Sequence, residues 1–397
     1  MSLTRSLMIR LEDILAIAWR ELRSILGDSG AILFFLVVPF AYPFLYAALY
    51  GAEVAREAPL VVVDRSRSEL SREFVRRIDA SPDVSVVART TTETEATPYL
   101  DRGEAYGVLV IPEDFSRRLM QGRQATVNLH STFAAALYYK GYSLTATEVA
   151  LQLGRELEAE RHPAASTEAT RIQVRPIESE WTSSFNPQGG FQGFLLPGVL
   201  VLILQQTLLL GCSMLMGTQR ERGTLARPRL HLGGHYLGVV RLMLGRALCY
   251  LGLYTMSSLF VLVLAPRLFG LPQLLDLGVY CWLLPPMLLA MIFFALFWAL
   301  VVQHREKTMI LWVFTSIPFL FLTGLSWPLS AIPAPLRALG YLIPSTPGVQ
   351  AYVAASSMGA QPYDILPQYT TLWVQAIVYF LLATYTYARM LRREPSH

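Results

Sequence analysis

Long apolar runs without charged residues dominate the chain and predict six transmembrane helices. At a rise of about 1.5 Å per residue, about 20 apolar residues cross the roughly 30 Å hydrocarbon core of a bilayer. The runs lie at residues 31–52, 191–216, 247–266, 277–302, 308–327 and 369–388. Several of these runs contain prolines, which are expected to kink the helices. Such kinks are tolerated because neighbouring helices can satisfy the freed backbone groups.

The segment before the first run is amphipathic. Between residues 4 and 27, apolar side chains recur at helical spacing, with charged side chains between them. The apolar positions are Leu7, Leu11, Ile14, Ala18, Leu22 and Ile25. This pattern predicts a helix that lies in the membrane interface. A surface helix of a small cytosolic domain is the alternative, but the direct continuation into the first span favours the interface.

Residues 53–190 follow a different pattern, which predicts a soluble α/β domain. The short β-rich runs APLVVVD, VSVVA, AYGVLVI and ATVNLHS alternate with helical segments, and a long helix is predicted over 133–160. Strand–helix alternation is typical of a largely parallel sheet. The run RIQVRPI, residues 171–177, is a further strand candidate.

The predicted fold is therefore an α-helical polytopic membrane protein with an inserted α/β domain. Residues 1–52 hold the interfacial helix and the first span, 53–190 the domain, and 191–397 the other five spans. Residues 217–246 form a charged loop between spans. The segment 328–368 is rich in proline and apolar residues, which predicts short helices that lie on the membrane surface or re-enter it.

Charge distribution predicts the orientation. Of 397 residues, 53% are hydrophobic and 16% are charged, against about 25% charged in soluble proteins. The segments 1–30, 217–246, 303–307 and 389–397 hold 15 Lys and Arg, whereas the short loops 267–276 and 328–368 hold only Arg267 and Arg337. Because cationic short loops stay in the cytoplasm, both termini are expected there. Residues 53–190 are then expected outside the cytoplasmic membrane.

No catalytic or metal-binding constellation stands out. The sequence lacks the phosphate-loop, G-x-S-x-G and HExxH patterns. The three cysteines lie in apolar runs, and His231 and His235 are interpreted as loop residues rather than a metal pair. Asp64, Ser66, Ser68 and Ser71 fit a helix N-cap better than a hydrolytic site. No charged residue lies deep in a predicted span, which disfavours a proton or ion relay.

The most specific local feature is the loop after the second span. Arg220, Glu221, Arg222, Arg227 and Arg229 lie within a dozen positions. Gly223 is expected to end the helix in the left-handed conformation, and Thr224 is a suitable N-cap for a short helix along the membrane surface. The alternative is that these charges only enforce topology.

The order of these parts resembles the permease subunit of ABC-2-type export ABC transporters, in the branch with a large extracytoplasmic domain. WRELRSILGDSGAILFFLVVPF is similar to the family's elbow helix and first span, and FNPQGGFQGFLLPGVL to its return into the membrane. QRERGTL resembles the E-R-x-x-G-T loop, and GLSWPLSAIPAPLRALGYLIPSTPGVQAY the re-entrant region. The spacing here is one residue shorter than E-R-x-x-G-T, and Pro228 stands where that family has helix formers.

The resemblance implies a transport subunit that carries no catalytic residues and no cofactor of its own. ATP and Mg would belong to P-loop ATPase partners, and the permease would pair with a second copy or a close paralogue. The contact with the ATPase would comprise Arg220, Glu221, Arg222, Gly223, Thr224 and Leu225. Membrane lipid and a periplasmic adaptor are further candidate partners, and no nucleic acid is expected.

The expected function is ATP-driven export of a lipophilic or amphiphilic substrate across a bacterial inner membrane. The alternative is a membrane-anchored receptor or adhesion protein whose external domain carries the function. An intramembrane transferase is a third alternative, but the sequence offers no buried nucleophile or base for it.

Overall fold

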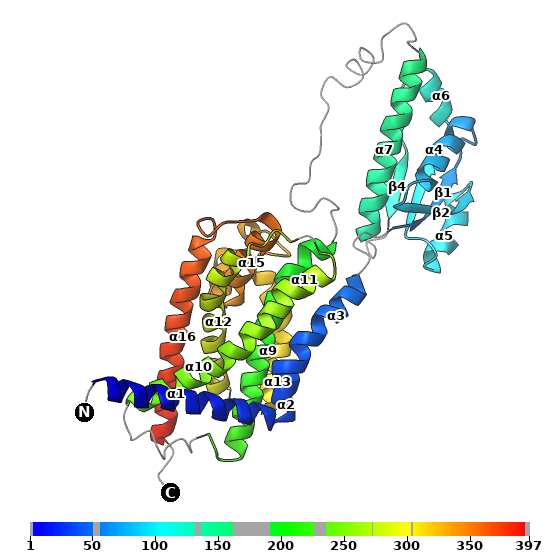
Figure 1. The fold of residues 1–397 in the computed structure, drawn as a ribbon. Coiled ribbons are helices and arrows are strands. Elements are labelled where there is room, and N and C mark those ends of the chain that lie inside the picture. Colours follow the sequence, from blue (N-terminus) through cyan, green and yellow to red (C-terminus); the bar gives the residue numbers. More distant parts are fainter. Residues whose placement is uncertain are drawn as a thin grey trace. The chain divides into compact units, whose positions relative to one another are not determined.

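The computed structural model divides the chain into two compact units (Figure 1). One unit comprises Met1–Gly51 and Gly189–His397, and the other comprises Ala52–Gln188. These boundaries lie within two residues of those expected from composition. The structure describes residues 3–50, 56–131, 136–161, 191–225, 236–271, 273–302 and 305–393. The strand predicted at 171–177 lies outside the described residues.

The smaller unit contains a four-stranded sheet with the order β2-β1-β3-β4. Strand β1 pairs in parallel with β2 and β3, and β4 runs antiparallel to β3. The strands are β1 (Ala58–Asp64), β2 (Val84–Thr90), β3 (Gly107–Ile111) and β4 (Asn128–Ser131). The helices are α4 (Glu69–Asp79), α5 (Glu93–Asp101), α6 (Phe115–Met120) and α7 (Ala136–Arg161). The largely parallel sheet expected from the alternation is present.

Helices cover both faces of this sheet, which explains why β3 is apolar throughout and β1 is apolar up to its last residue, Asp64. Leu60 and Val62 pack with α4, α6 and α7, whereas Val61 and Val63 pack with α5 on the other face. The hydroxyl of Tyr142 on α7 donates a hydrogen bond to the Pro59 carbonyl at 2.8 Å. This bond ties the long helix to the central strand.

The cluster of Asp64, Ser68 and Ser71 caps helix α4, as predicted. Ser68 accepts from the Ser71 backbone N–H at 3.1 Å, and the Ser71 hydroxyl accepts from the Ser68 N–H at 3.0 Å. The Ser71 hydroxyl donates to Asp64 at 2.8 Å. The reciprocal pair is a capping box, so these polar groups are occupied by structure and not poised for hydrolysis.

Arg77 joins α4 to α7. Its guanidinium pairs with Glu73 at 2.8 Å and with Glu156 at 2.7 Å. Hydrogen bonds from Arg77 lower the pKa of both carboxyl groups below their ordinary value. Because both carboxylates face solvent, the pairs contribute little to stability and mainly fix how the helices lie together.

The larger unit is a helical bundle with one helix lying across its end (Figure 1). Helix α1 (Leu3–Leu26) lies across the bundle at the end where α9 and α16 finish, which we call the α1 end. The first span combines α2 (Ser29–Ile32), the π-helical η1 (Leu33–Val37) and α3 (Val38–Tyr50). The next are α9 (Phe191–Glu221), then α10 (Tyr236–Ser258) continued by η4 (Leu259–Leu264) and α11 (Ala265–Leu268), and α12 (Leu277–Val301). The last are α13 (Arg305–Leu322), η5 (Leu329–Ala331), α14 (Ala334–Gly340), α15 (Ser345–Met358) and α16 (Leu366–Arg393).

Within the described residues, five helices are long and apolar enough to cross a membrane. They are Ser29–Ala48, Leu195–Glu221, Gly238–Leu268, Leu277–Val301 and Leu366–Arg392. The sixth predicted span, 308–327, corresponds to α13, whose apolar part Lys307–Leu322 is shorter than the others. The prediction of six equivalent spans is therefore only partly met. The third span also begins earlier than residue 247, because α10 starts at Tyr236.

Helix α9 is the core of the bundle. It packs against α3, α12, α13 and α15, so its apolar surface is almost wholly buried by protein. The segment 328–368 forms short helices, as predicted, but α15 is not a surface helix. Its residues from Ser345 to Ala351 are nearly all buried, and it packs on α9 and α16. Tertiary packing therefore draws this segment into the bundle.

Gly107 on β3 tests the packing of the smaller unit. A methyl group there would lie 2.7 Å from Tyr142 Cε2 and 3.0 Å from Leu60 Cδ1. Gly107→Ala should therefore destabilise the unit by about 1–3 kcal/mol through overpacking. Gly154→Ala on α7 is the control, because its methyl group would meet nothing within 4 Å. Hydrogen exchange of β3 peptides in the full chain should accelerate only in Gly107→Ala, and equal exchange in both variants would contradict the packing described.

Candidate functional site

Helix α9 ends in a Schellman motif at Gly223. The Gly223 N–H donates to the Arg220 carbonyl at 3.0 Å, and the Thr224 N–H donates to the Gln219 carbonyl at 2.8 Å. Gly223 has φ +61°, the left-handed conformation that glycine adopts without steric cost. The predicted stop is confirmed, and the chain turns sharply at this point.

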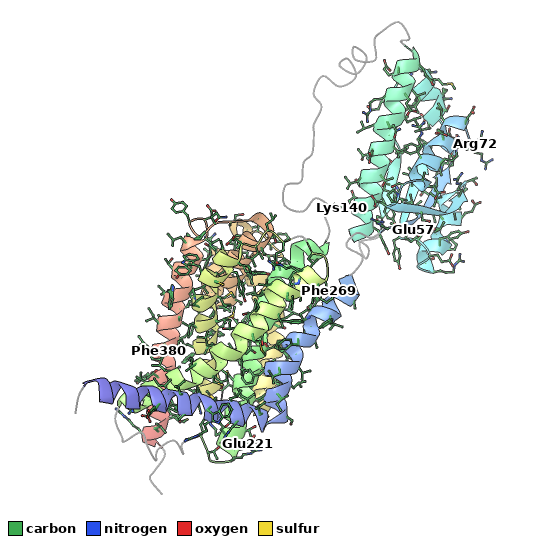
Figure 2. All side chains as sticks on the ribbon, viewed as in Figure 1. Glu57, Arg72, Lys140, Glu221, Phe269 and Phe380 are labelled. Atoms are coloured by element: carbon green, nitrogen blue, oxygen red, sulfur yellow. The ribbon has the colours of Figure 1, made fainter. Side chains whose placement is uncertain are left out.

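The residues expected to contact an ATPase differ in exposure. Glu221, Arg222 and Gly223 are exposed at the α1 end of the bundle, where Figure 2 labels Glu221. Arg220 donates to the Leu300 carbonyl at 3.4 Å. Leu225 is only 2% exposed, and its carbonyl accepts from the Tyr387 hydroxyl at 2.6 Å. We call residues 221–223 the exposed tip, since the residues on both sides of it are fixed to the bundle.

The short helix predicted to begin near Thr224 lies outside the described residues, as do Pro228, His231 and His235. That this helix is shorter than in the family pattern stays a prediction.

A buried ionic cluster lies directly beside this segment. Arg246 on α10 donates to the Gln219 side chain at 2.8 Å, and its Nε is 3.4 Å from Glu21 Oε2. The Tyr250 hydroxyl donates to Glu21 Oε1 at 2.6 Å. Arg246 is 3% exposed and Glu21 5%. Each charge depends on the other, because an isolated ion in an apolar interior is strongly destabilising.

This cluster connects four helices. Glu21 belongs to α1, Gln219 to α9 and Arg246 to α10, and the Arg246 guanidinium lies 5.7 Å from the centre of the Tyr387 ring on α16. A second pair, Arg241 with Asp13 at 2.6 Å, joins α10 to α1 in a more exposed position. The end of α9 is therefore connected through this cluster to α1, α10 and α16.

The sequence predicted no charged residue deep in a span, and it did not predict a buried ion pair at the α1 end. Arg246 lies inside the apolar helix Gly238–Leu268 rather than at its boundary. Its partner Glu21 is more than 200 residues away in sequence, on a helix where charged side chains looked like the solvent-facing side. Three arginines, Arg241, Arg246 and Arg267, lie within this apolar helix, and the sequence did not show that Arg246 is the buried one or that Glu21 is its partner.

An open groove adjoins the exposed tip. It has a volume of about 360 Å³ and lies between the end of α1 and the end of α9. Its lining comprises Arg20, Arg23, Ser24, Gly27, Asp28, Leu215, Thr218, Gln219, Arg222 and Thr224. Arg222 and Thr224, which are expected to contact an ATPase, belong to this lining. So does Gln219, which precedes that contact in the chain. These residues therefore share a surface with the interfacial helix α1.

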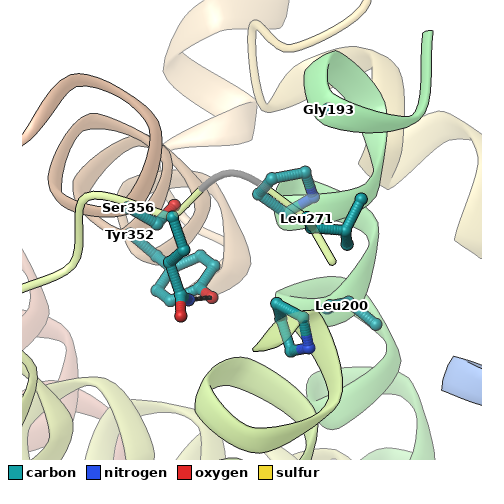
Figure 3. A pocket seen from close by; sticks show the side chains of 8 residues that line it. Gly193, Leu200, Leu271, Tyr352 and Ser356 are labelled. Atoms are coloured by element: carbon teal, nitrogen blue, oxygen red, sulfur yellow. Dashed lines mark hydrogen bonds between the residues drawn. The ribbon is translucent and has the colours of Figure 1, made fainter. Parts of the chain in front are cut away.

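Uncharged polar groups also occur within the bundle. The amides of Gln205 and Gln206 on α9 are buried and have no hydrogen-bond partner among the described residues. At the opposite end, a pocket of about 10 Å³ is lined by α9, α11 and α15 (Figure 3). There Gln273 donates to the Tyr352 hydroxyl at 3.1 Å and to the Leu262 carbonyl at 2.7 Å. This pocket is large enough for about one water molecule.

The described residues contain no group of three or more His, Cys, Asp or Glu side chains that could hold a metal ion. Cys212 and Cys249 are buried thiols, and Cys281 is exposed. The described side chains at this end of the bundle instead join neighbouring helices through buried polar contacts.

Comparison with known proteins agrees with this architecture. The family model described as ABC-2 family transporter protein matches residues 30–385. The chain therefore belongs to the ABC-2 family of transporter proteins. It is a multi-pass membrane protein and the permease component of an ABC transporter, a class that works with separate ATPase subunits.

Three relatives from Escherichia coli K12 are similar over most of their length. The probable multidrug ABC transporter permease YbhS is 22% identical over 337 residues, covering 83% of this chain and 84% of the relative. The inner membrane transport permease YhhJ is 24% identical over 388 residues, covering 95% and 97%. The probable multidrug ABC transporter permease YbhR is 22% identical over 329 residues, covering 82% and 84%.

The ionic cluster makes a quantitative prediction. Arg246→Gln leaves the Glu21 carboxylate buried without its cation, which costs about 3–5 kcal/mol. The double variant Glu21→Gln/Arg246→Gln removes both charges and should be less destabilised than the sum of the two single changes. Thermal unfolding of the purified protein, followed by intrinsic fluorescence, measures this.

Arg241→Gln is the matched control, because it removes a more exposed ion pair from the same helix and should cost at most about 1 kcal/mol. An equal loss in Arg241→Gln and Arg246→Gln, or strict additivity in the double variant, would contradict a coupled buried pair.

Proposed function

We propose that this chain is the transmembrane subunit of an ATP-driven exporter in a bacterial inner membrane, working as a pair with a second copy or close paralogue. ATPase subunits bind and hydrolyse ATP with Mg, and they engage the segment Arg220–Leu225. The observation that carries the proposal is the exposed tip at the end of α9, since α9 is the helix around which the bundle packs. A displacement of the tip is therefore passed directly to α9, the helix at the core of the permease.

The mechanism follows from how the tip is held. Backbone hydrogen bonds attach Gly223 and Thr224 to the last turn of α9. The Gln219 side chain accepts a hydrogen bond from Arg246 within the buried cluster. Closure of the ATPase pair displaces the tip, and α9 carries that displacement to α1 and α10. Because packed helices shift as units rather than bending continuously, a small movement at one end rearranges the bundle.

The proposed substrate is lipophilic or amphiphilic. The spans are apolar and carry many large hydrophobic side chains on their exposed surface, which suits a cargo of this kind. Two relatives carry the word multidrug in their names. Residues 53–190 are proposed to lie outside, where they are available to a periplasmic adaptor.

The alternative of a membrane-anchored receptor is not favoured. The family match runs from residue 30 to residue 385 and so covers the spans as well as the domain between them. In a receptor the spans would need only to anchor the chain.

The coupling role is tested with the permease co-reconstituted with its ATPase. Glu221→Ala removes the carboxylate of the exposed tip, and Gly223→Pro removes the N–H that donates to Arg220. Both should lower export of a fluorescent lipophilic amine about tenfold or more while ATP hydrolysis continues, as expected when about 1.4 kcal/mol or more of coupling is lost.

Two controls separate coupling from folding. Gly270→Pro alters another left-handed glycine, with φ +68°, away from the tip, and Glu69→Ala removes an exposed carboxylate in the smaller unit. Both should retain export. Normal export by Glu221→Ala and Gly223→Pro would overturn the assignment of the tip.

The proposed orientation is tested by cysteine labelling in a background without the three native cysteines. Arg72→Cys, in the smaller unit, should react with an impermeant maleimide once the outer membrane is opened. Glu221→Cys should react only after the inner membrane is permeabilised, because the basic end of the bundle faces the cytoplasm. Labelling of Glu221→Cys in intact spheroplasts would contradict this topology.

A further inference from the structure

We propose that the groove between α1 and the end of α9 binds the phosphate headgroup of an anionic phospholipid. The groove is the volume of about 360 Å³ that lies beside the exposed tip. The inference concerns the permease alone, so it stands apart from the question of which ATPase the tip engages.

The charge of the groove favours an anion. Arg20 and Arg23 approach from α1 and Arg222 from the end of α9, and all three side chains are exposed. Among the described residues of the lining, Asp28 is the only carboxylate, and it accepts a hydrogen bond from the Ala31 N–H at 3.0 Å. Three guanidinium groups around one volume supply the planar donors that phosphate oxygens accept.

A buried donor lies in the same groove. Thr218 is 6% exposed, and its hydroxyl has no hydrogen-bond partner in the described residues. Most buried hydroxyl groups in proteins are hydrogen-bonded. A phosphate oxygen seated between the arginines would satisfy this hydroxyl.

The surroundings favour a lipid over a soluble phosphate or a protein side chain. Trp19 on α1 is 57% exposed, and Leu15 and Leu26 are exposed on the same helix. The Arg23 guanidinium lies 5.2 Å from the centre of the Trp19 ring. Tryptophan beside arginine on an interfacial helix is typical of the headgroup level, where the apolar side chains contact acyl chains. The volume suits a headgroup, and it is too small for an inserted helix.

A bound headgroup would neutralise three like charges and bridge α1 to the end of α9. The lipid would thus hold the interfacial helix against the coupling segment, in parallel with the buried pair of Glu21 and Arg246. Anionic lipid would then be part of the structure through which the tip acts on the bundle.

The test is native mass spectrometry of the purified permease titrated with phosphatidylglycerol. The wild-type protein should retain this lipid, and Arg20→Gln/Arg23→Gln/Arg222→Gln should bind it about tenfold or more weakly, as expected for loss of several basic contacts. Replacing the same three residues by lysine should restore much of the binding. The control Arg267→Gln/Arg337→Gln removes two exposed arginines from the segments 267–276 and 328–368 and should bind as the wild type does.

Two further binding measurements identify the ligand. Phosphatidylcholine should bind more weakly than phosphatidylglycerol, and glycerol 3-phosphate should not compete at equal concentration. Equal binding of both lipids, full competition by glycerol 3-phosphate, or unchanged binding by the triple glutamine variant would each overturn the proposal. So would a triple variant that loses ATPase co-purification while keeping phosphatidylglycerol, because the groove would then be a protein contact.

Discussion

A pair of buried charges constrains the α1 end of the bundle, where we propose that the ATPase binds. Glu21 and Arg246 lie in an apolar interior, where each ion is tolerated only beside the other. Gln219 and Tyr250 add hydrogen bonds that fix their geometry. Because Glu21 lies on α1 and Arg246 on α10, these two helices cannot separate without leaving a charge unpaired, and α9 is joined to them by the hydrogen bond of Gln219. The interfacial helix is therefore a working part of the bundle.

The proposed coupling role suits the form of the segment Arg220–Leu225. A segment that receives force must be exposed to its partner, yet must not yield independently of the helix behind it. The Schellman motif at Gly223 satisfies the terminal carbonyls of α9 and turns the chain within one residue. Leu225 then returns to the interior beside Tyr387. Only the residues between these two anchors face solvent.

The smaller unit is stabilised by different means. Its sheet is buried on both faces, and hydrogen bonds at the strand ends and helix caps fix its loops. Nothing in its described residues resembles a catalytic site. The buried polar connections between helices at the α1 end lie in the bundle.

The sequence by itself determined the parts that depend on local pattern. Apolar runs located the spans, strand–helix alternation located the sheet, and Gly223 and Ser68 located a helix end and a cap, because these features depend on neighbours within a few residues. Only the tertiary structure decided that α15 enters the bundle, that α13 is short, and that Glu21 is buried against Arg246. Those features depend on contacts between residues far apart in the chain, and a charge on an amphipathic helix gives no local sign of which partner will cover it.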